Sequence, residues 1–435
     1  MIVAKIRAKC SNFRILFSIS AVLFSNGLFS QIYTVNACPG ENTDSQINIS
    51  WCTDTNIKKS FVVYTTIKDS GLKKIKSVTP QVRVCTVFDS IYSKSPDNKD
   101  IYENAIFNKC DAALSGLKKN TEYLYWIVRD KADPSLLTPE RARRFKTSGA
   151  KEWSACIISD FHSYTPLPKR QVAATEMLDK ICEYDKEVDW ILHLGDVTAW
   201  GGSYSFWKNL YENRYFKNYM WAGVNGNHDN MTRKYLLSNR FFRNVNFYPN
   251  NGYEGEEGVC YYFKYHNVLF IMLNNENMRT EPQFQRAAEW VRKVVKENKA
   301  DYTVVCEHYQ WFFGKDGKAS QYGRWSDIFD ELGIDLALAG NNHIYLRTNA
   351  LYNGKETDGT KGTVYVQTPS SDNERGSSMN EELQANADII KFRWTEGPKT
   401  VGALHLKVTA KEMTLLLINR HGDILDSVKV LKKNK

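Results

Sequence analysis

The chain has 435 residues, of which 42% are hydrophobic and 25% are charged. This length predicts two domains, and the composition excludes a disordered or a fibrous protein. The formal net charge of +9 is a mild excess for a chain of this size. It excludes the strongly basic class of nucleic-acid-binding proteins, so we expect no specific recognition of nucleic acid.

The first 30 residues have the pattern of a secretory signal peptide. A mostly apolar run covers residues 15–24, and the small residue Ser30 precedes Gln31. Four basic residues come before this run: Lys5, Arg7, Lys9 and Arg14. The run is shorter than the roughly 20 apolar residues of a transmembrane helix. We predict a signal peptide over residues 1–30 and an exported protein without a transmembrane anchor, in a periplasm, on a cell surface or secreted.

Cysteine spacing does not define a disulfide framework. Export permits disulfides, but the spacing assigns no partners. Cys156, Cys182 and Cys306 lie within apolar runs, which favours buried thiols. Because no CxxC pair occurs, the sequence predicts no structural zinc site.

Residues 31–148 have the pattern of an all-β domain. Short alternating runs at 47–51, 59–64, 81–88 and 121–128 are separated by polar segments. Strands at this spacing predict an antiparallel β-sandwich. The late part of the segment resembles a fibronectin type III module through Leu117, Asn120, Thr121, Tyr123, Tyr125 and the run Phe145-Lys-Thr147.

Residues 149–435 alternate between strands and helices, which predicts an α/β fold. We expect strands at 155–159, 190–194, 302–306 and 335–339 and just before Gly226, and helices at 171–184, 205–216 and 283–297. Residues 258–265 and 267–273 predict a hairpin around His266. Runs at 363–368, 402–408, 412–418 and 424–431 predict a C-terminal β extension. Residues 369–398 are expected to form a long exposed loop.

Five of these strands are followed by side chains that can bind a metal ion. The residues are Asp160 and His162, Asp196, Asn227 with His228 and Asp229, His308, and Asn341 with His343. In open α/β sheets, ligands bind at the carboxyl ends of the strands. Oxygen and imidazole donors without a thiolate suit Zn²⁺, Mn²⁺ or Fe ions. Two ions roughly 3.5 to 4 Å apart can activate water for in-line attack on phosphorus.

Roles follow from the position of each residue in this series. Asp196, in the middle strand loop, is the candidate for a carboxylate that bridges two ions. His228 is the candidate catalytic acid for a leaving oxygen, and Asp229 is expected to hold its tautomer. Tyr309 is a candidate for contact with substrate. Arg347 could contact a phosphate or form a surface ion pair.

The ordered series resembles the metallophosphoesterase superfamily, which includes calcineurin-like and purple acid phosphatases. The matching blocks are Asp160-Phe-His162, Gly195-Asp196, Gly226-Asn-His-Asp229, His308 and Gly340-Asn-Asn-His343. The resemblance implies a four-layer α/β/β/α sandwich with two metal ions. One ion would be held by Asp160, His162, Asp196 and His343, and the other by Asp196, Asn227 and His308. The preceding β-sandwich looks like that of purple acid phosphatases.

Two positions depart from the pattern of the family. Ala199 stands where purple acid phosphatases have a tyrosine, and His162 favours the non-purple type of first site. Asn341 replaces the first histidine of the motif Gly-His-x-His. An amide oxygen is a weaker and harder ligand than imidazole. We therefore expect Asn341 to leave the second site weak, empty or selective for Mn²⁺ or Mg²⁺.

The sequence predicts an exported, two-domain, metal-dependent phosphoesterase in which a metal-bound hydroxide attacks a small phosphate ester. Candidate ions are Mn, Zn, Fe and Mg, and a phosphomonoester is the expected substrate. One alternative is a phosphodiesterase or nuclease of the same superfamily. Another is a pseudoenzyme with weakened metal binding that binds a glycan or a protein. The physiological substrate and the oligomeric state stay open.

Overall fold

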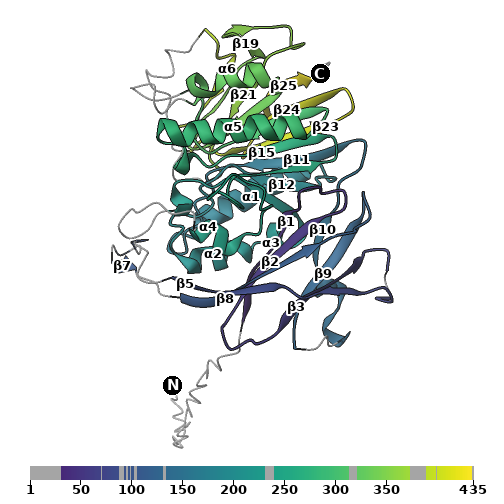
Figure 1. Cartoon of the computed structure of the whole chain (residues 1–435). Coiled ribbons are helices and arrows are strands. Elements are labelled where there is room, and N and C mark those ends of the chain that lie inside the picture. The colour runs from purple at the N-terminus through teal and green to yellow at the C-terminus, as the bar shows by residue number, and fades with distance from the viewer. Residues whose placement is uncertain are drawn as a thin grey trace, which may run out of the picture.

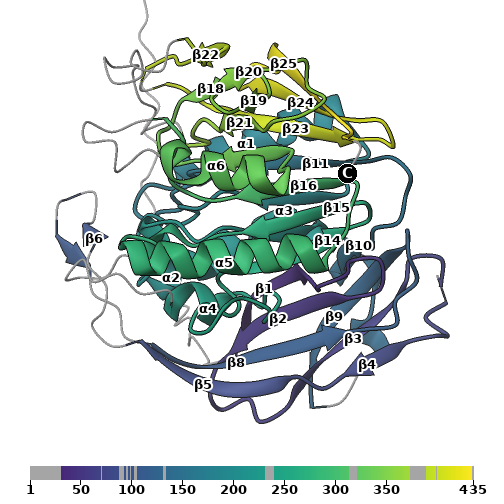
Figure 2. The same ribbon diagram turned by 45° about the horizontal axis from the view of Figure 1, so that its top comes forward.

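The computed structural model describes residues 31–433, except residues 70, 88–92, 95–96, 98, 102–104, 131–133, 231–239, 313–320, 373–387 and 398. The predicted signal peptide, residues 1–30, therefore lies outside the described residues. The chain has a mixed α/β fold with two large sheets (Figure 1). In both views the N-terminal strands lie at the lower end of the molecule and the C-terminal strands at the upper end (Figures 1 and 2).

The first large sheet has ten strands, and it contains both the first and the last strand of the described chain. Its order is β25 (Ile424–Leu431), β24 (Glu412–Asn419), β23 (Gly402–Val408), β11 (Trp153–Ile158), β12 (Trp190–His193), β13 (Met220–Gly223), β1 (Ile32–Pro39), β2 (Ile47–Thr53), β8 (Ala105–Leu114) and β5 (Gln81–Val87). Strands β11, β12 and β13 are parallel. Strand β1 continues beside β13, also in parallel, with Ala37 opposite Met220.

A four-stranded sheet covers part of the N-terminal region. It consists of β10 (Arg143–Lys146), β9 (Glu122–Arg129), β3 (Ser60–Thr66) and β4 (Lys76–Val78). Trp51 of β2 and Tyr125 of β9 are buried in one core, and the indole of Trp51 donates a hydrogen bond to Ser60. The fibronectin type III resemblance and the boundary at residue 148 stay predictions. The structure adds that strands on both sides of that boundary share one sheet.

The second large sheet has seven strands. Its order is β14 (Tyr261–Tyr265), β15 (Val268–Met272), β16 (Tyr302–Cys306), β17 (Leu336–Ala339), β21 (Val364–Gln367), β18 (Tyr345–Arg347) and β22 (Phe392–Trp394). Strands β15, β16, β17 and β21 are parallel. The predicted hairpin is confirmed as β14 and β15, which join at His266. Two short ribbons pair β19 (Leu351–Tyr352) with β20 (Lys355–Glu356) and β6 (Ser93–Lys94) with β7 (Asp100–Ile101).

The two large sheets face each other through aromatic side chains. Trp190 of β12 lies 5.2 Å from Tyr265 and 5.1 Å from Phe270 of the second sheet, measured between ring centroids. Helix α1 (Lys169–Tyr184) contacts β11, β23 and β24 of the first sheet. Helices α2 (Tyr204–Tyr211) and α3 (Arg214–Asn218) contact β1 of the same sheet.

Helices α5 (Glu281–Glu297) and α6 (Tyr322–Leu332) share a second core with the seven-stranded sheet. Figure 2 shows both helices in front of the strands β14 to β16. A capping box between Thr280 and Gln283 begins α5, and Trp290 and Val291 lie on its buried face. Aliphatic and aromatic burial at this helical spacing docks α5 on the sheet.

The remaining described helical segments are short. They are α4 (Arg240–Val245) and the 3-10 turns η1 (Pro134–Leu136), η2 (Pro139–Arg141), η3 (His228–Asn230) and η4 (Asn275–Asn277). The single helix expected at 205–216 is instead α2 and α3, because the side chain of Asn213 accepts from the backbone N–H of Tyr215 and starts a new helix. No helix in the described ranges has the length and the apolar character needed to cross a membrane.

The sequence favours buried thiols at three cysteines, and the structure shows how far each of them is buried. Cys156 and Cys306 are buried free thiols, and Cys182 is a half-buried free thiol. Burial raises the pKa of the Cys182 thiol. These three residues therefore act as small apolar core residues rather than as reactive groups.

Candidate metal centre

The polar residues that follow the parallel strands of both sheets meet at one edge. Asp160 and His162 follow β11, Asp196 follows β12, and His343 follows β17. His308 follows β16 of the facing sheet. All of these side chains are buried, with exposed fractions of 9% or less for the whole residues. Burial of so many ionisable groups is costly unless they pair with one another or bind ions.

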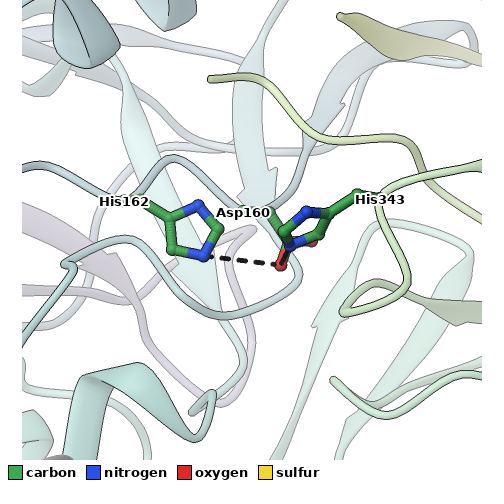
Figure 3. Close-up of side chains that lie close together, drawn as sticks. All are labelled: Asp160, His162 and His343. Atoms are coloured by element: carbon green, nitrogen blue, oxygen red, sulfur yellow. Dashed lines mark ion pairs between the residues drawn. The ribbon is translucent and has the colours of Figure 1, made fainter. Parts of the chain in front are cut away.

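One potential ligand group consists of Asp160, His162 and His343 (Figure 3). Nε2 of His343 lies 3.1 Å from Oδ1 of Asp160, and Nε2 of His162 lies 3.9 Å from the same oxygen. Figure 3 shows both imidazoles turned toward the carboxylate from opposite sides. These are three of the four side chains that the resemblance assigns to the first ion.

Asp196 lies between this group and a second one. Its Oδ2 is 3.5 Å from Nε2 of His162 and 3.3 Å from Nε2 of His308. Asp160, Asp196 and His308 form a further potential ligand group, and Nε2 of His308 lies 3.2 Å from Oδ1 of Asn227. The shared position of Asp196 is the geometry expected of a bridging carboxylate.

The backbone at this edge is strained at the ligand positions. Five of the predicted site residues have a positive φ: Asp160 (52°), His162 (45°), Asp196 (52°), Asn341 (66°) and His343 (59°). Residues other than glycine seldom adopt this conformation, and clusters of such residues occur where function requires them. The tight turns bring side chains from successive loops close together. Gly226 permits a close approach, because a Cβ there would lie 2.2 Å from Oδ1 of Asp196.

Hydrogen bonds orient the imidazoles toward the carboxylates. Nδ1 of His308 lies 2.7 Å from the carbonyl of Leu194, and Nδ1 of His228 lies 2.8 Å from the carbonyl of Ala199. A carbonyl only accepts, so Nδ1 carries a proton in both rings, and Nε2 is the ring nitrogen that can bind an ion. Nδ1 of His162 lies 2.6 Å from Oδ2 of Asp372. Pairing of a ligand histidine with a carboxylate is a recurrent feature of metal sites.

Asp372 also corrects the expectation of a long exposed loop at 369–398, and strand β22 (Phe392–Trp394) lies within the same range. Ser370, Ser371 and Asp372 are buried, and Ser371 donates its backbone N–H to the carbonyl of Ser159. The signal that identified the other ligand loops is present here too, because these polar residues directly follow strand β21. Residues 373–387 of the expected loop lie outside the described residues.

Asp229 does not have the role expected of it. Its carboxylate accepts hydrogen bonds from the backbone N–H groups of Asp196, Thr198 and Gly226. The tautomer of His228 is held by Ala199 instead. Burial and the charge of Asp196 raise the pKa of Asp229 to about 7. Asp229 therefore fixes the loops that carry Asp196 and His228, through their backbones.

Asn341 contacts both the first ligand group and a neighbouring side chain. Its backbone N–H donates to Oδ2 of Asp160 at 3.0 Å, and its side-chain amide donates to Oε1 of Gln310 at 2.5 Å. Ligation by the Asn341 side chain stays a prediction. The hydrogen bond to Gln310 restricts the orientation of the amide, which agrees with a weaker ligand than the histidine of the family motif.

The electrostatics of the site favour ionised carboxylates. Burial raises the pKa of Asp160, but the positive charges of His343, His308 and His162 outweigh it and hold the pKa at about 2. The pKa of Asp196 is well below its usual value, because His308 and His228 outweigh its burial. Both carboxylates are therefore anionic at neutral pH, as metal ligation requires.

The residues present fit a site for metal ions. Oδ2 of Asp160 accepts from Ser159 and from Asn341, whereas Oδ1 is buried and accepts no hydrogen bond from a described residue. Oδ1 instead faces imidazole nitrogens on two sides. A cation bound among these atoms would satisfy the carboxylate and the imidazole lone pairs together. The donor set of carboxylate and imidazole suits Zn²⁺, Mn²⁺ and Fe ions.

A cavity of about 420 Å³ opens beside this centre. Asn227 and Asn341 form its inner side, and Tyr309, Arg279 and Arg324 lie elsewhere on its wall. The predicted candidate Tyr309 therefore lines a pocket. Arg279 lies in the loop between η4 and α5, and Arg324 lies on α6; no sequence motif pointed to either arginine.

Arg347, by contrast, belongs to the framework. Its guanidinium binds both carboxylate oxygens of Asp426 on β25, at 2.7 and 2.9 Å. The sequence left a surface ion pair as the alternative for Arg347; the ion pair is present and bidentate, but both of its side chains are largely buried.

Comparisons with known proteins agree with this centre. Residues 155–345 match the family model of the calcineurin-like phosphoesterases. Two uncharacterized proteins from two strains of Mycobacterium tuberculosis are each 22% identical over 373 residues, which covers 78% of this chain and 66% of theirs. The aligned region thus spans slightly less than two thirds of those relatives.

Solved structures show the same fold at low identity. The purple acid phosphatase PPD1 from seeds of yellow lupin (Lupinus luteus) has a TM-score of 0.68 and 15% identity, covering 93% of this chain and 75% of that enzyme. A structure of PhoD has a TM-score of 0.55 and 11% identity, covering 92% of this chain and 89% of that chain. The family match includes Asp160, Asp196 and His343, so residues 155–345 form a domain of the calcineurin-like metallophosphoesterase superfamily.

Proposed function

We propose that the chain is a metal-dependent hydrolase of phosphate esters, with phosphomonoesters as its main substrates. The observation that carries the proposal is the position of Asp196, whose Oδ2 lies within 3.5 Å of an imidazole nitrogen from each ligand group. Such a shared carboxylate is what two closely spaced ions require. The facing sheets with helices outside them support the four-layer arrangement that the family resemblance implies.

The ligand residues divide into two sets around Asp196. Asp160, His162 and His343 would hold one ion, and Asn227 and His308 would hold the other. Bound ions (Mn, Zn, Fe or Mg) would supply positive charge for the phosphate and lower the pKa of water. The ordered carbonyl and carboxylate partners of the histidines keep the imidazoles in the orientation that ligation needs.

His228 is suited to protonate the leaving oxygen. Nδ1 donates to the carbonyl of Ala199, so Nε2 is the atom that gains and releases the catalytic proton. The ring is half-buried, and its centroid lies 5.1 Å from that of His162. It is therefore close to the ligand set while still reachable by substrate.

A second candidate function is a pseudoenzyme that keeps one ion and binds a glycan or protein partner. The hydrogen bond between Asn341 and Gln310 favours this alternative, because it hinders rotation of the Asn341 amide toward an ion. A phosphodiesterase or nuclease activity is the alternative within the hydrolases. We further propose export, on the basis of residues 1–30, which lie outside the described residues.

The test is hydrolysis by the chain without residues 1–30, stripped of metal and reloaded with Mn²⁺, Zn²⁺, Mg²⁺ or Fe. 4-Nitrophenyl phosphate and bis(4-nitrophenyl) phosphate serve as monoester and diester, and export is tested separately by locating the full-length protein after cell fractionation. We expect metal-dependent turnover with preference for the monoester. Preference for the diester would support the phosphodiesterase. Tight binding of one ion without turnover of either ester would support the pseudoenzyme.

A further inference from the structure

The cavity beside the metal centre contains Arg324, whose pKa is lowered by burial, an effect that the charges of Glu307 and Glu281 offset only in part. Nη1 of Arg324 on α6 donates to the carbonyl of Met278 at 2.8 Å, and its guanidinium carbon lies 4.1 Å from the centroid of the Phe284 ring. The residue is half-buried. Within the described ranges, no carboxylate lies at ion-pair distance from Arg324. Packing on the Phe284 ring and the hydrogen bond to the Met278 carbonyl hold the guanidinium in place, while some of its N–H donors stay available.

The second arginine of the cavity is already partnered. Nη2 of Arg279 lies 2.8 Å from Oε2 of Glu276 and 3.1 Å from the hydroxyl of Tyr309. The Tyr309 hydroxyl also donates to Glu276. Arg279 is thus neutralised at the more exposed rim. Arg324 is the group in the wall that gains most from an anionic ligand, because a partly desolvated charge is stabilised by a counter-charge.

A buried amide provides an independent sign of a ligand. Gln321 is only 3% exposed and lines the same cavity, and its Oε1 accepts no hydrogen bond from the residues that the structure describes. Gln310, also on the wall, uses its own Oε1 to accept from Asn341. A buried carbonyl oxygen without a donor costs free energy unless a ligand or water supplies one. The cavity therefore presents a cation and a hydrogen-bond acceptor on its wall.

We propose that this cavity receives the leaving group of the substrate, and that Arg324 selects phosphate esters whose leaving group carries a second anionic group. Gln321 would accept a hydrogen bond from a hydroxyl or amide of the same leaving group. The shared chemistry is a second carboxylate or phosphate beyond the scissile phosphate. The inference rests on the proposed function, because it takes the scissile phosphate to lie at the metal centre and the leaving group to extend into the cavity.

The experiment measures binding of phosphonates that cannot be hydrolysed, by calorimetry on the Mn²⁺-loaded protein. The probes are (4-carboxybenzyl)phosphonate and its neutral isostere, (4-carbamoylbenzyl)phosphonate. We expect the carboxylate to bind at least tenfold more tightly. Arg324→Gln should reduce this ratio to about 1. Arg292→Gln removes an exposed arginine that pairs with Glu331 on another surface, and it should leave the ratio unchanged.

Equal affinity of the two probes for the unaltered protein would overturn the inference. So would an unchanged ratio in Arg324→Gln with native far-ultraviolet circular dichroism. If that variant does not fold, Arg324→Lys is measured instead, and it should keep a ratio above 1 but below that of the unaltered protein. An Arg324→Lys ratio equal to that of the unaltered protein would also overturn the inference. A bisphosphonate probe distinguishes a phosphate from a carboxylate as the preferred second anion.

Turnover separates this inference from the proposed function. If the protein hydrolyses 4-carbamoylphenyl phosphate but binds the two phosphonates equally, the inference is overturned and the proposed function stands. Absence of turnover with every ester, together with an Arg324-dependent preference in binding, would contradict the proposed function and support the anion site.

Discussion

Nδ1 of His162 and Oδ2 of Asp372 lie 2.6 Å apart although the residues are 210 positions apart in the chain. The contact fixes the ring so that Nε2 faces Asp160 and Asp196. It also joins the loop after β11 of the first sheet to the loop after β21 of the second. The site is therefore built across the two facing sheets, and its geometry depends on how they pack.

We expect Asp372→Asn to weaken metal binding roughly 10- to 100-fold, because partners of ligand histidines contribute effects of this size. The affinity is measured by competition with a chromogenic chelator. Asp185→Asn is the matched control: Asp185 pairs with His405 at 2.7 Å away from the site, so the same change of charge should leave metal affinity unaltered. Equal effects of the two substitutions would contradict the assignment.

His228→Gln should lower turnover most for esters with poor leaving groups. The side chain is assigned the proton that the leaving oxygen receives, and such catalysis contributes about 10²- to 10⁴-fold. We expect a loss of about 100-fold or more with phenyl phosphate and a much smaller loss with 2,4-dinitrophenyl phosphate. The number of bound ions should not change. Equal losses with both esters would assign His228 to binding instead.

Asn341→His should strengthen the second ion. Imidazole is the better ligand for Zn²⁺, and position 341 has φ of 66°, close to the 59° at which His343 already lies. We expect at least a tenfold gain in affinity for the more weakly bound ion, read from a two-step titration with Zn²⁺. Gln310→Ala tests whether release of the native amide is enough by itself. No change in Asn341→His would show that this position does not face an ion.

His193 makes stability depend on pH. Burial and, to a smaller extent, the charge of His308 lower the pKa of His193 from 6.5 to about 3. The unfolded chain therefore binds a proton below about pH 6.5 that the folded chain does not. The free energy of unfolding should fall with decreasing pH, by up to about 1.4 kcal/mol per unit from this residue.

Urea unfolding of the unaltered protein and of His193→Gln between pH 7 and pH 5 measures how much His193 contributes to the pH dependence of the free energy of unfolding. The variant should be less stable at pH 7, because a side chain fitted to Tyr248 and the rings of Trp221 and Phe242 is replaced. Its stability should nevertheless fall less steeply with decreasing pH. Parallel pH profiles for the two proteins would rule out a neutral, buried His193.

The ligand set could be predicted because each member directly follows an apolar strand. Asp160, Asp196 and His308 are examples, and a local pattern is enough to find them. The helix α6 carried a comparable signal, since Trp325, Ile328 and Phe329 are buried at helical spacing and Gly333 ends the helix with a positive φ. The helix was nevertheless absent from the predicted elements.

Other features depend on contacts that no local pattern contains. The pairing of Ala37 with Met220 places the N-terminal strands in the same sheet as β11, β12 and β13. The cavity wall brings Arg279 of one loop beside Arg324 of a distant helix. Asp229 was assigned to His228 because the residues are adjacent in sequence. The fold instead turns its carboxylate toward three backbone N–H groups.

Anomalous diffraction from crystals of the chain without residues 1–30, soaked in Mn²⁺, tests the central claim most directly. We predict two peaks, one among Asp160, His162 and His343 and one beside His308 and Asn227, with Asp196 between them. The second peak should be weaker in the unaltered protein than in Asn341→His. Absence of any peak at these side chains, or peaks only elsewhere on the surface, would contradict the account of a metal-dependent phosphoesterase.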